Sequence, residues 1–170
     1  MEKKDLKPAG VFKYFEEICQ VPRPSKKEEK MIAYLKTFGA KHNLETKVDE
    51  AGNVLIKKPA TPGKENLQTV VLQSHIDMVC EKNNDVQHDF LTDPIETEID
   101  GEWLKAKGTT LGADNGIGVA TELAILADDS IEHGPLECLF TVDEETGLTG
   151  AFALKEGFMS GDILLNLDSE

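Results

Sequence analysis

Ionisable side chains stand just past the ends of three apolar runs in the chain. They are His75 and Asp77 after residues 70–72, Glu144 and Glu145 after residues 139–142, and Asp168 after residues 164–167. The runs have the length and composition of buried strands. Because the carboxyl ends of neighbouring parallel strands line one crevice, we expect these side chains to converge if the three strands are parallel. A further carboxylate, Asp114, begins a helical segment rich in small residues.

Carboxylates gathered in such a crevice repel one another unless their pKa values rise or a cation lies between them. Several carboxylates with an imidazole suit Zn²⁺, and also Mn²⁺ or Co²⁺, better than Ca²⁺, which prefers oxygen ligands alone. Two ions sharing a bridging carboxylate would neutralise the cluster and activate a water molecule. Glu144 and Glu145 would then divide into one ligand and one general base. His75 and Asp77 face the same side of an extended segment, so Asp77 can accept a hydrogen bond from the imidazole.

Each of these residues also has an ordinary structural explanation. A single histidine after a strand is usually packed or solvated, an aspartate before a helix is usually its N-cap, and an acidic turn is usually exposed. The functional interpretation depends on the occurrence of all these residues together, since every one of them falls where a single fold places its crevice. Other catalytic classes lack support, because the sequence contains no G-x-G-x-x-G, G-x-x-x-x-G-K-[ST] or G-x-S-x-G pattern. We expect the remaining histidines to be surface residues: His42, His88 and His133.

Helical and strand patterns alternate along the chain. Apolar periodicity predicts helices over residues 11–19, 26–40 and 115–128, with Ser25 and Glu28 forming a capping box before the second. Strands are expected at residues 45–49, 53–57, 69–73, 136–142 and 163–167, and one or two over 95–107. The alternation indicates an α/β fold, a three-layer α/β/α arrangement around a largely parallel central sheet.

Two packing expectations accompany this fold. A stripe of small residues should let the third helix lie close to the sheet: Gly116, Ala120, Ala124 and Ala127. Trp103 and the cysteines are expected to be packing residues.

Composition narrows the class of partner. The chain has 170 residues, enough for one domain with a real core, and a formal net charge of −14. Nucleic acids and anionic membranes both require a basic face, so we expect neither as a partner. No apolar stretch is long enough to span a bilayer, and no secretory signal is visible at the start. The three cysteines form no C-x-x-C motif, which is typical of reduced thiols in a cytoplasmic protein.

Three motifs in this order resemble those of the co-catalytic zinc peptidases, a superfamily that includes carboxypeptidase G-like enzymes, aminotripeptidases and aminoacyl-histidine dipeptidases. They are residues 74–79 (SHIDMV), 112–116 (GADNG) and 143–147 (DEETG). The longer strings 75–83 (HIDMVCEKN) and 108–118 (GTTLGADNGIG) are most similar to the aminoacyl-histidine dipeptidase family. The likeness extends over nearly the whole chain.

The resemblance implies a centre of two Zn²⁺ ions, with Co²⁺ or Mn²⁺ as possible substitutes. The implied metal ligands are His75, Asp114, Glu145 and Asp168. Asp114 would bridge the ions, with His75 and Asp168 completing one site and Glu145 joining a histidine from far downstream in the other. Glu144 would be the general base and Asp77 would orient His75. The resemblance also implies a cis Asp114–Asn115 peptide bond, a dipeptide substrate of Xaa-His type and a homodimer.

Members of that family are far longer than this chain, carry a lid domain and place their last histidine ligand near the C-terminus. We therefore interpret residues 1–170 as the N-terminal portion of a catalytic metallopeptidase domain, without the lid domain and the C-terminal catalytic segment. This portion is expected to be inactive alone. Two alternatives stay open, namely a related zinc amidohydrolase, such as a deacylase or tripeptidase, and a non-catalytic fragment.

Overall fold

The structure is a computed structural model that describes residues 5–168. Its helices are α1 (Ala9–Cys19), α2 (Glu29–Lys41), α3 (Ala113–Ala127), α4 (Glu144–Gly147) and α5 (Thr149–Ala153). Its strands are β1 (Glu45–Val48), β2 (Val54–Lys58), β3 (Val70–His75), β4 (Thr97–Asp100), β5 (Trp103–Ala106), β6 (Leu136–Thr141) and β7 (Ile163–Asn166). Among these residues, no helix combines the length and the apolar character that a membrane span requires.

The main sheet has five strands in the order β1-β2-β6-β3-β7 and is mixed. β6, β3 and β7 run parallel, whereas the predicted hairpin of β1 and β2 joins β6 in an antiparallel sense. The α/β class is therefore confirmed, and the parallel part of the sheet consists of the strands that precede the candidate residues. Because β3, β6 and β7 share one direction, their carboxyl ends lie at one edge, where His75 pairs with Thr141.

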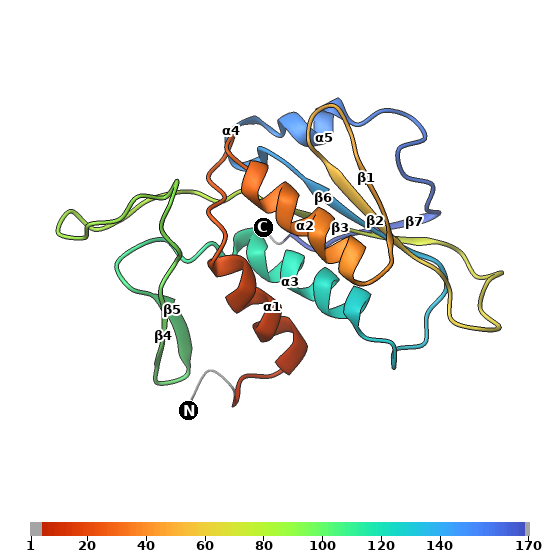
Figure 1. Cartoon of the computed structure of the whole chain (residues 1–170), viewed down its shortest axis with the longest axis horizontal. Helices are drawn as coiled ribbons and strands as arrows, with labels where there is room; N and C mark the ends of the chain where they lie inside the picture. The colour runs from red at the N-terminus through yellow and green to blue at the C-terminus, as the bar shows by residue number, and fades with distance from the viewer. Residues whose placement is uncertain (1–4, 169–170) are drawn as a thin grey trace.

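The three long helices cover one face of the sheet, with α2 and α3 lying across it and α1 packed against α3 (Figure 1). The main hydrophobic core lies between these helices and the sheet, around Phe15, Leu35 and Phe140. The opposite face is covered by a smaller cluster, in which Leu55, Val71 and Leu139 pack against the chain after α5. The sandwich thus has a thick helical layer on one face and a thinner layer on the other.

The small-residue stripe of α3 faces α1 and not the sheet. A Cβ atom added at Gly116 would lie 3.1 Å from the Phe15 ring, and one added at Gly10 of α1 would lie 3.5 Å from Cβ of Ala124. The prediction that these small residues bring α3 close to the sheet was wrong, because helical periodicity identifies a small face without identifying its neighbour. The stripe instead allows two helices to pack closely.

Two local predictions also require correction. Helix α2 begins at Glu29, its N-cap Glu28 makes no side-chain capping bond, and Lys26 has a left-handed φ of 65°. The predicted capping box does not form, because Ser25 and Glu28 bind other partners. β4 and β5 form a separate two-stranded sheet whose Trp103 is 71% exposed, so Trp103 is not a packing residue.

Candidate metal centre

The imidazole of His75 lies at the centre of the candidate site. Its Nε2 atom is 3.0 Å from Oδ1 of Asp114, 3.6 Å from Oδ2 of Asp168 and 3.8 Å from Oε2 of Glu144. Glu145 also has a carboxylate oxygen within 4.8 Å of a His75 ring nitrogen and of Glu144. The structure therefore brings together all the residues for which the sequence predicts a metal-binding or base role.

Strand direction explains how residues distant in sequence meet. His75 is the last residue of β3, Glu144 follows the neighbouring parallel strand β6, and Asp168 follows β7 on the other side of β3. Asp114 arrives from the start of α3, where Gly112 has a left-handed φ of 66° that glycine adopts at little cost. The Asp114–Asn115 peptide bond is cis, as the resemblance implied.

Asp77 holds the other side of the imidazole. Its Oδ1 atom lies 3.2 Å from Nδ1 of His75 and accepts a hydrogen bond from the backbone N–H of Glu144. Its Oδ2 atom accepts hydrogen bonds from the Ser25 hydroxyl and from the backbone N–H of Glu145. A carboxylate in this position keeps hydrogen on Nδ1, so Nε2 is the nitrogen that faces the other carboxylates and that can bind a metal ion in place of its proton.

The pKa values reflect this arrangement. Burial would raise the pKa of Asp77, but hydrogen bonds from His75, Glu144 and Ser25 outweigh it and lower that pKa to about 2. Burial would lower the pKa of His75, but Asp77 and Asp114 outweigh it and raise that pKa to about 9. Burial and neighbouring carboxylates raise the pKa values of Glu144 and Glu145, against the opposing effect of His75. The site thus favours a positive charge at the Nε2 position.

The donor set fits a divalent transition-metal ion. Two ligands on a tetrahedral ion with bonds of about 2.0 Å stand roughly 3.3 Å apart. The gaps of 3.0, 3.6 and 3.8 Å around Nε2 bracket that separation. Two sets of potential ligand atoms share His75, one with Asp114 and Asp168 and the other with Glu144 and Glu145. An imidazole with carboxylates suits Zn²⁺ and its chemical neighbours.

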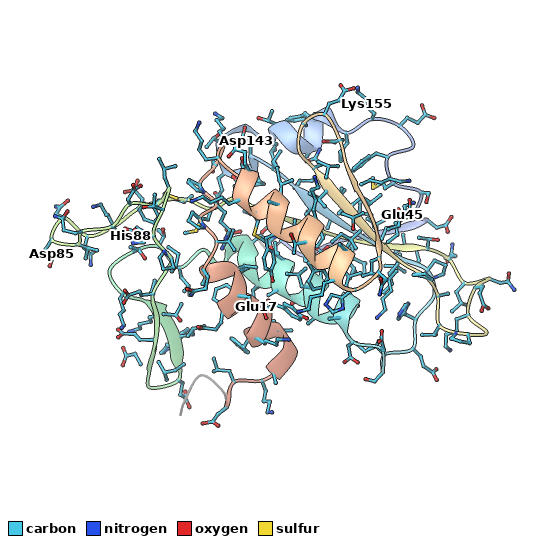
Figure 2. The ribbon with its side chains drawn as sticks, in the orientation of Figure 1. Glu17, Glu45, Asp85, His88, Asp143 and Lys155 are labelled. Carbon is cyan, nitrogen blue, oxygen red and sulfur yellow. The ribbon has the colours of Figure 1, made fainter. Side chains whose placement is uncertain are left out.

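The ordinary explanations do not account for these positions. Asp114 has non-helical backbone angles within α3, and its Oδ1 atom lies 3.0 Å from Nε2 of His75, whereas no hydrogen bond from a helix N–H group to its carboxylate is found among residues 5–168. Glu144 and Glu145 are partly buried and not fully solvated. The other histidines lie outside the candidate metal groups within residues 5–168: His42, His88 and His133. Figure 2 shows His88 in the long loop that also carries Asp85, away from Asp143.

The residues that support the acidic turn after β6 were not predicted from the sequence. Glu28 accepts hydrogen bonds from the backbone N–H groups of Asp143 and Lys26, so α2 starts beside that turn (Figure 2). Asp143 has a left-handed φ of 50° and accepts hydrogen bonds from the hydroxyls of Thr146 and Thr149. The Ser25-x-x-Glu28 pattern was visible in the sequence, but it was assigned to a helix cap.

Fold, site geometry and sequence together define the class of protein. The sequence model of peptidase family M20/M25/M40 matches residues 71–167, a range that includes His75, Asp114 and Glu145 and ends one residue before Asp168. The chain therefore belongs to this peptidase family.

Individual relatives give a finer comparison. The chain is 52% identical to the cytosol non-specific dipeptidase of Escherichia coli, over 99% of this chain and 35% of the relative. It superposes on the crystal structure of aminoacylhistidine dipeptidase from Vibrio alginolyticus with a TM-score of 0.97 and 56% identity, covering 100% of this chain and 35% of that one. For aminopeptidase PepT from Bacillus cereus the TM-score is 0.80 and the identity 26%, covering 95% of this chain and 43% of that one. The chain thus spans about a third of the length of its two most similar relatives named here.

Proposed function

We propose that the complete protein is a metal-dependent dipeptidase of broad Xaa-His type with two Zn²⁺ ions in its active site. The observation that carries this proposal is the convergence of three carboxylates on Nε2 of His75 at 3.0 to 3.8 Å. The names of the Escherichia coli and Vibrio relatives support the dipeptide substrate. The name of the Escherichia coli relative supports a cytoplasmic location. The proposal also includes a homodimer.

Within this proposal each candidate residue has one role. Asp114 would bridge the two ions, and its exposed side chain has Oδ1 3.0 Å from Nε2 of His75, the residue that both ligand groups share. His75 and Asp168 would complete the shell of one ion, and Glu145 would bind the other. Residues 1–170 form the N-terminal portion of the catalytic domain. The chain spans 35% of the Escherichia coli relative, and the lid and the last histidine ligand that the resemblance implies would lie outside residues 1–170.

The chain's own residues then perform the proton transfers. When bound, the zinc ions supply Lewis-acid chemistry, polarising the scissile carbonyl and making water more acidic. The Glu144 carboxylate accepts a proton from the attacking water as its oxygen bonds to the carbonyl carbon. Glu144 returns that proton to the leaving amine nitrogen as the C–N bond breaks. In the metal-free site, burial and nearby carboxylates raise the pKa of Glu144, which makes its carboxylate a stronger proton acceptor.

The base assignment is tested by Glu144→Gln in the complete protein. We expect hydrolysis of dipeptides to fall by about 10²–10⁴-fold, the usual contribution of a general base. Metal affinity should change little, because Gln keeps the size of the side chain and leaves the proposed ligands intact. The matched control is Glu156→Gln, a substitution of an exposed glutamate away from the metal groups. Hydrolysis by Glu144→Gln at the wild-type rate would contradict the assignment.

The substrate is tested separately with a panel of dipeptides, tripeptides and acyl-amino acids. Preferential hydrolysis of dipeptides supports the proposal. Preferential hydrolysis of tripeptides or acyl-amino acids would assign the protein to the related amidohydrolases instead.

A further inference from the structure

Arg23 lies buried behind the metal centre, where its backbone is attached to the chain that follows β3. Its side chain is only 3% exposed, and prolines flank it on both sides. Its carbonyl oxygen accepts a hydrogen bond from the backbone N–H of Met78, and Pro24 forms a parallel bridge with Met78. Proline fixes its own φ and restricts the preceding residue, so the Arg23 backbone has little freedom. The side chain therefore extends from a fixed point.

The guanidinium connects two chain segments that carry candidate metal ligands. Its Nη1 atom donates to the carbonyl oxygens of Ile76 at 3.2 Å and Asp77 at 3.1 Å. Its Nη2 atom donates to the carbonyl oxygen of Gly112 at 2.6 Å. Ile76 directly follows His75, and Gly112 is two residues before Asp114. One planar group thus spans the chain segments whose side chains meet at 3.0 Å in the site.

Two glycines make room for this group. A Cβ atom added at Gly112 would lie 2.5 Å from Nη2 of Arg23, and one added at Gly116 would lie 2.7 Å from the same nitrogen. Separations below 3.0 Å are sterically excluded without a shift of the neighbour. The glycines at both ends of the GADNG motif therefore form a cradle that fits the guanidinium.

The charge of Arg23 also fits its position. Burial lowers the pKa of Arg23, and nearby acidic groups, Asp77 and Asp114 among them, oppose that effect. A guanidinium remains protonated in proteins, so a permanent positive charge lies beneath the carboxylate cluster. A lysine could retain that charge, but its single ammonium group lacks the rigid fork that reaches both segments.

We propose that Arg23 is a positioning residue of the metal centre, whose guanidinium fixes the separation between the chain segment at the end of β3, with His75 and Asp77, and the segment at the start of α3, with Asp114. This inference rests on the proposed function, because it concerns the same metal-binding site. The guanidinium of Arg23 donates to backbone carbonyl groups and makes no hydrogen bond with the side chains of the candidate ligands among residues 5–168. It acts by keeping ligands from two segments at coordinating distance before an ion arrives.

The test compares Arg23→Lys and Arg23→Met with Lys58→Met in the complete protein. Lys58 is a matched control, since it is also a buried cation, 8% exposed, that donates to two backbone carbonyls, those of Ile125 and Asp128. Those carbonyls lie at the far end of α3 from Asp114. Titration calorimetry with Co²⁺ gives the dissociation constant, the visible spectrum of bound Co²⁺ reports coordination geometry, and thermal unfolding gives stability.

Both Arg23 variants are expected to bind Co²⁺ about 10- to 100-fold more weakly, the usual effect of losing a group that orients metal ligands. Their visible spectra should also change. Lys58→Met should unfold at a lower temperature yet keep its Co²⁺ affinity and spectrum. The inference would be overturned if both Arg23 variants kept the wild-type Co²⁺ affinity and spectrum. It would also be overturned if both variants failed to fold, because Arg23 would then be needed for the fold itself. Absence of Co²⁺ binding by the wild-type protein would instead refute the proposed function, and this inference with it.

Discussion

Glu122 provides a quantitative test of the packing beneath the site. It lies on the face of α3 that meets the sheet, is fully buried, and neighbours Ser74 and Cys138. Neither of its carboxylate oxygens has a hydrogen-bond partner among residues 5–168. Burial raises the pKa of Glu122 from 4.5 to about 8; the neighbouring Ser74 hydroxyl and Cys138 thiol oppose this rise, although neither is placed well enough to form a regular hydrogen bond with the carboxylate. The folded protein therefore holds this side chain as a neutral acid at pH 7.

The direction of the pH effect follows from this shift. Below pH 4.5 the side chain is protonated in both the folded and the unfolded protein, so its contribution does not vary with pH. Between pH 4.5 and about 8 only the unfolded chain releases the proton, so the free energy of unfolding falls as pH rises. At roughly 1.36 kcal/mol per pH unit, the loss reaches about 3 kcal/mol at pH 7 and stays below about 1 kcal/mol at pH 5.

Glu122→Gln removes this titration while retaining the shape of the neutral acid. Urea unfolding of the metal-free protein gives the free energy of unfolding of the variant and of the wild type at each pH. We expect the variant to gain about 2.5 kcal/mol relative to the wild type between pH 5 and pH 7. Any packing cost of the amide is common to both pH values and cancels. The control is Glu98→Gln, an exposed position on β4. A pH dependence identical to that of the wild type would refute the assignment of a buried neutral Glu122.

Three further outcomes are expected. Asp77→Asn should weaken Zn²⁺ binding by about 10- to 100-fold in titration calorimetry, because the amide cannot reproduce the charge that orients His75; unchanged affinity would contradict the role of Asp77. Gly150→Ala should lower the free energy of unfolding in urea by about 1–3 kcal/mol, because the new Cβ would lie 2.5 Å from the carbonyl oxygen of Val142; an unaffected midpoint would show that the turn can shift. Trp103→Ser should change that free energy by less than about 0.5 kcal/mol, because the ring is 71% exposed; a larger loss would indicate a contact absent from this structure.

The sequence predicted the convergence at the site because strand periodicity and strand direction are local signals with a geometric consequence. Residues that follow parallel strands share an edge, so the meeting of His75, Glu144 and Asp168 could be inferred without coordinates. Asp114 was different. Its position at a helix start also fitted a cap, and only the motif resemblance selected the bridging role that stays a prediction here.

Residues that bind backbone groups far away in the sequence could not be identified from local sequence patterns. Arg23 donates to carbonyl oxygens that lie 53, 54 and 89 residues further along the chain. Every residue has a carbonyl group, so no sequence pattern marks such partners. Ser25 was misassigned for a related reason, because the capping pattern fits local geometry equally well. Its hydroxyl instead binds Asp77, and tertiary contacts prevailed over a local preference.

The sequence also could not predict which neighbours the apolar face and the small-residue face of α3 contact. A stripe of small residues predicts close approach of some neighbour, whether helix or sheet. The choice depends on where α1 lies, which is set by packing across the whole helical layer. Glu122, on the face that does meet the sheet, gave no warning in its local sequence that it would be buried.

The central claim is that the side chains around His75 bind a divalent transition metal. The most direct test is anomalous diffraction at the zinc absorption edge, from crystals of the complete protein grown with Zn²⁺. We predict a zinc peak within about 2.0–2.2 Å of Nε2 of His75 and of carboxylate oxygens of Asp114 and Asp168. A structure at full zinc loading with no peak beside His75, or with zinc bound only elsewhere on the protein, would contradict the claim.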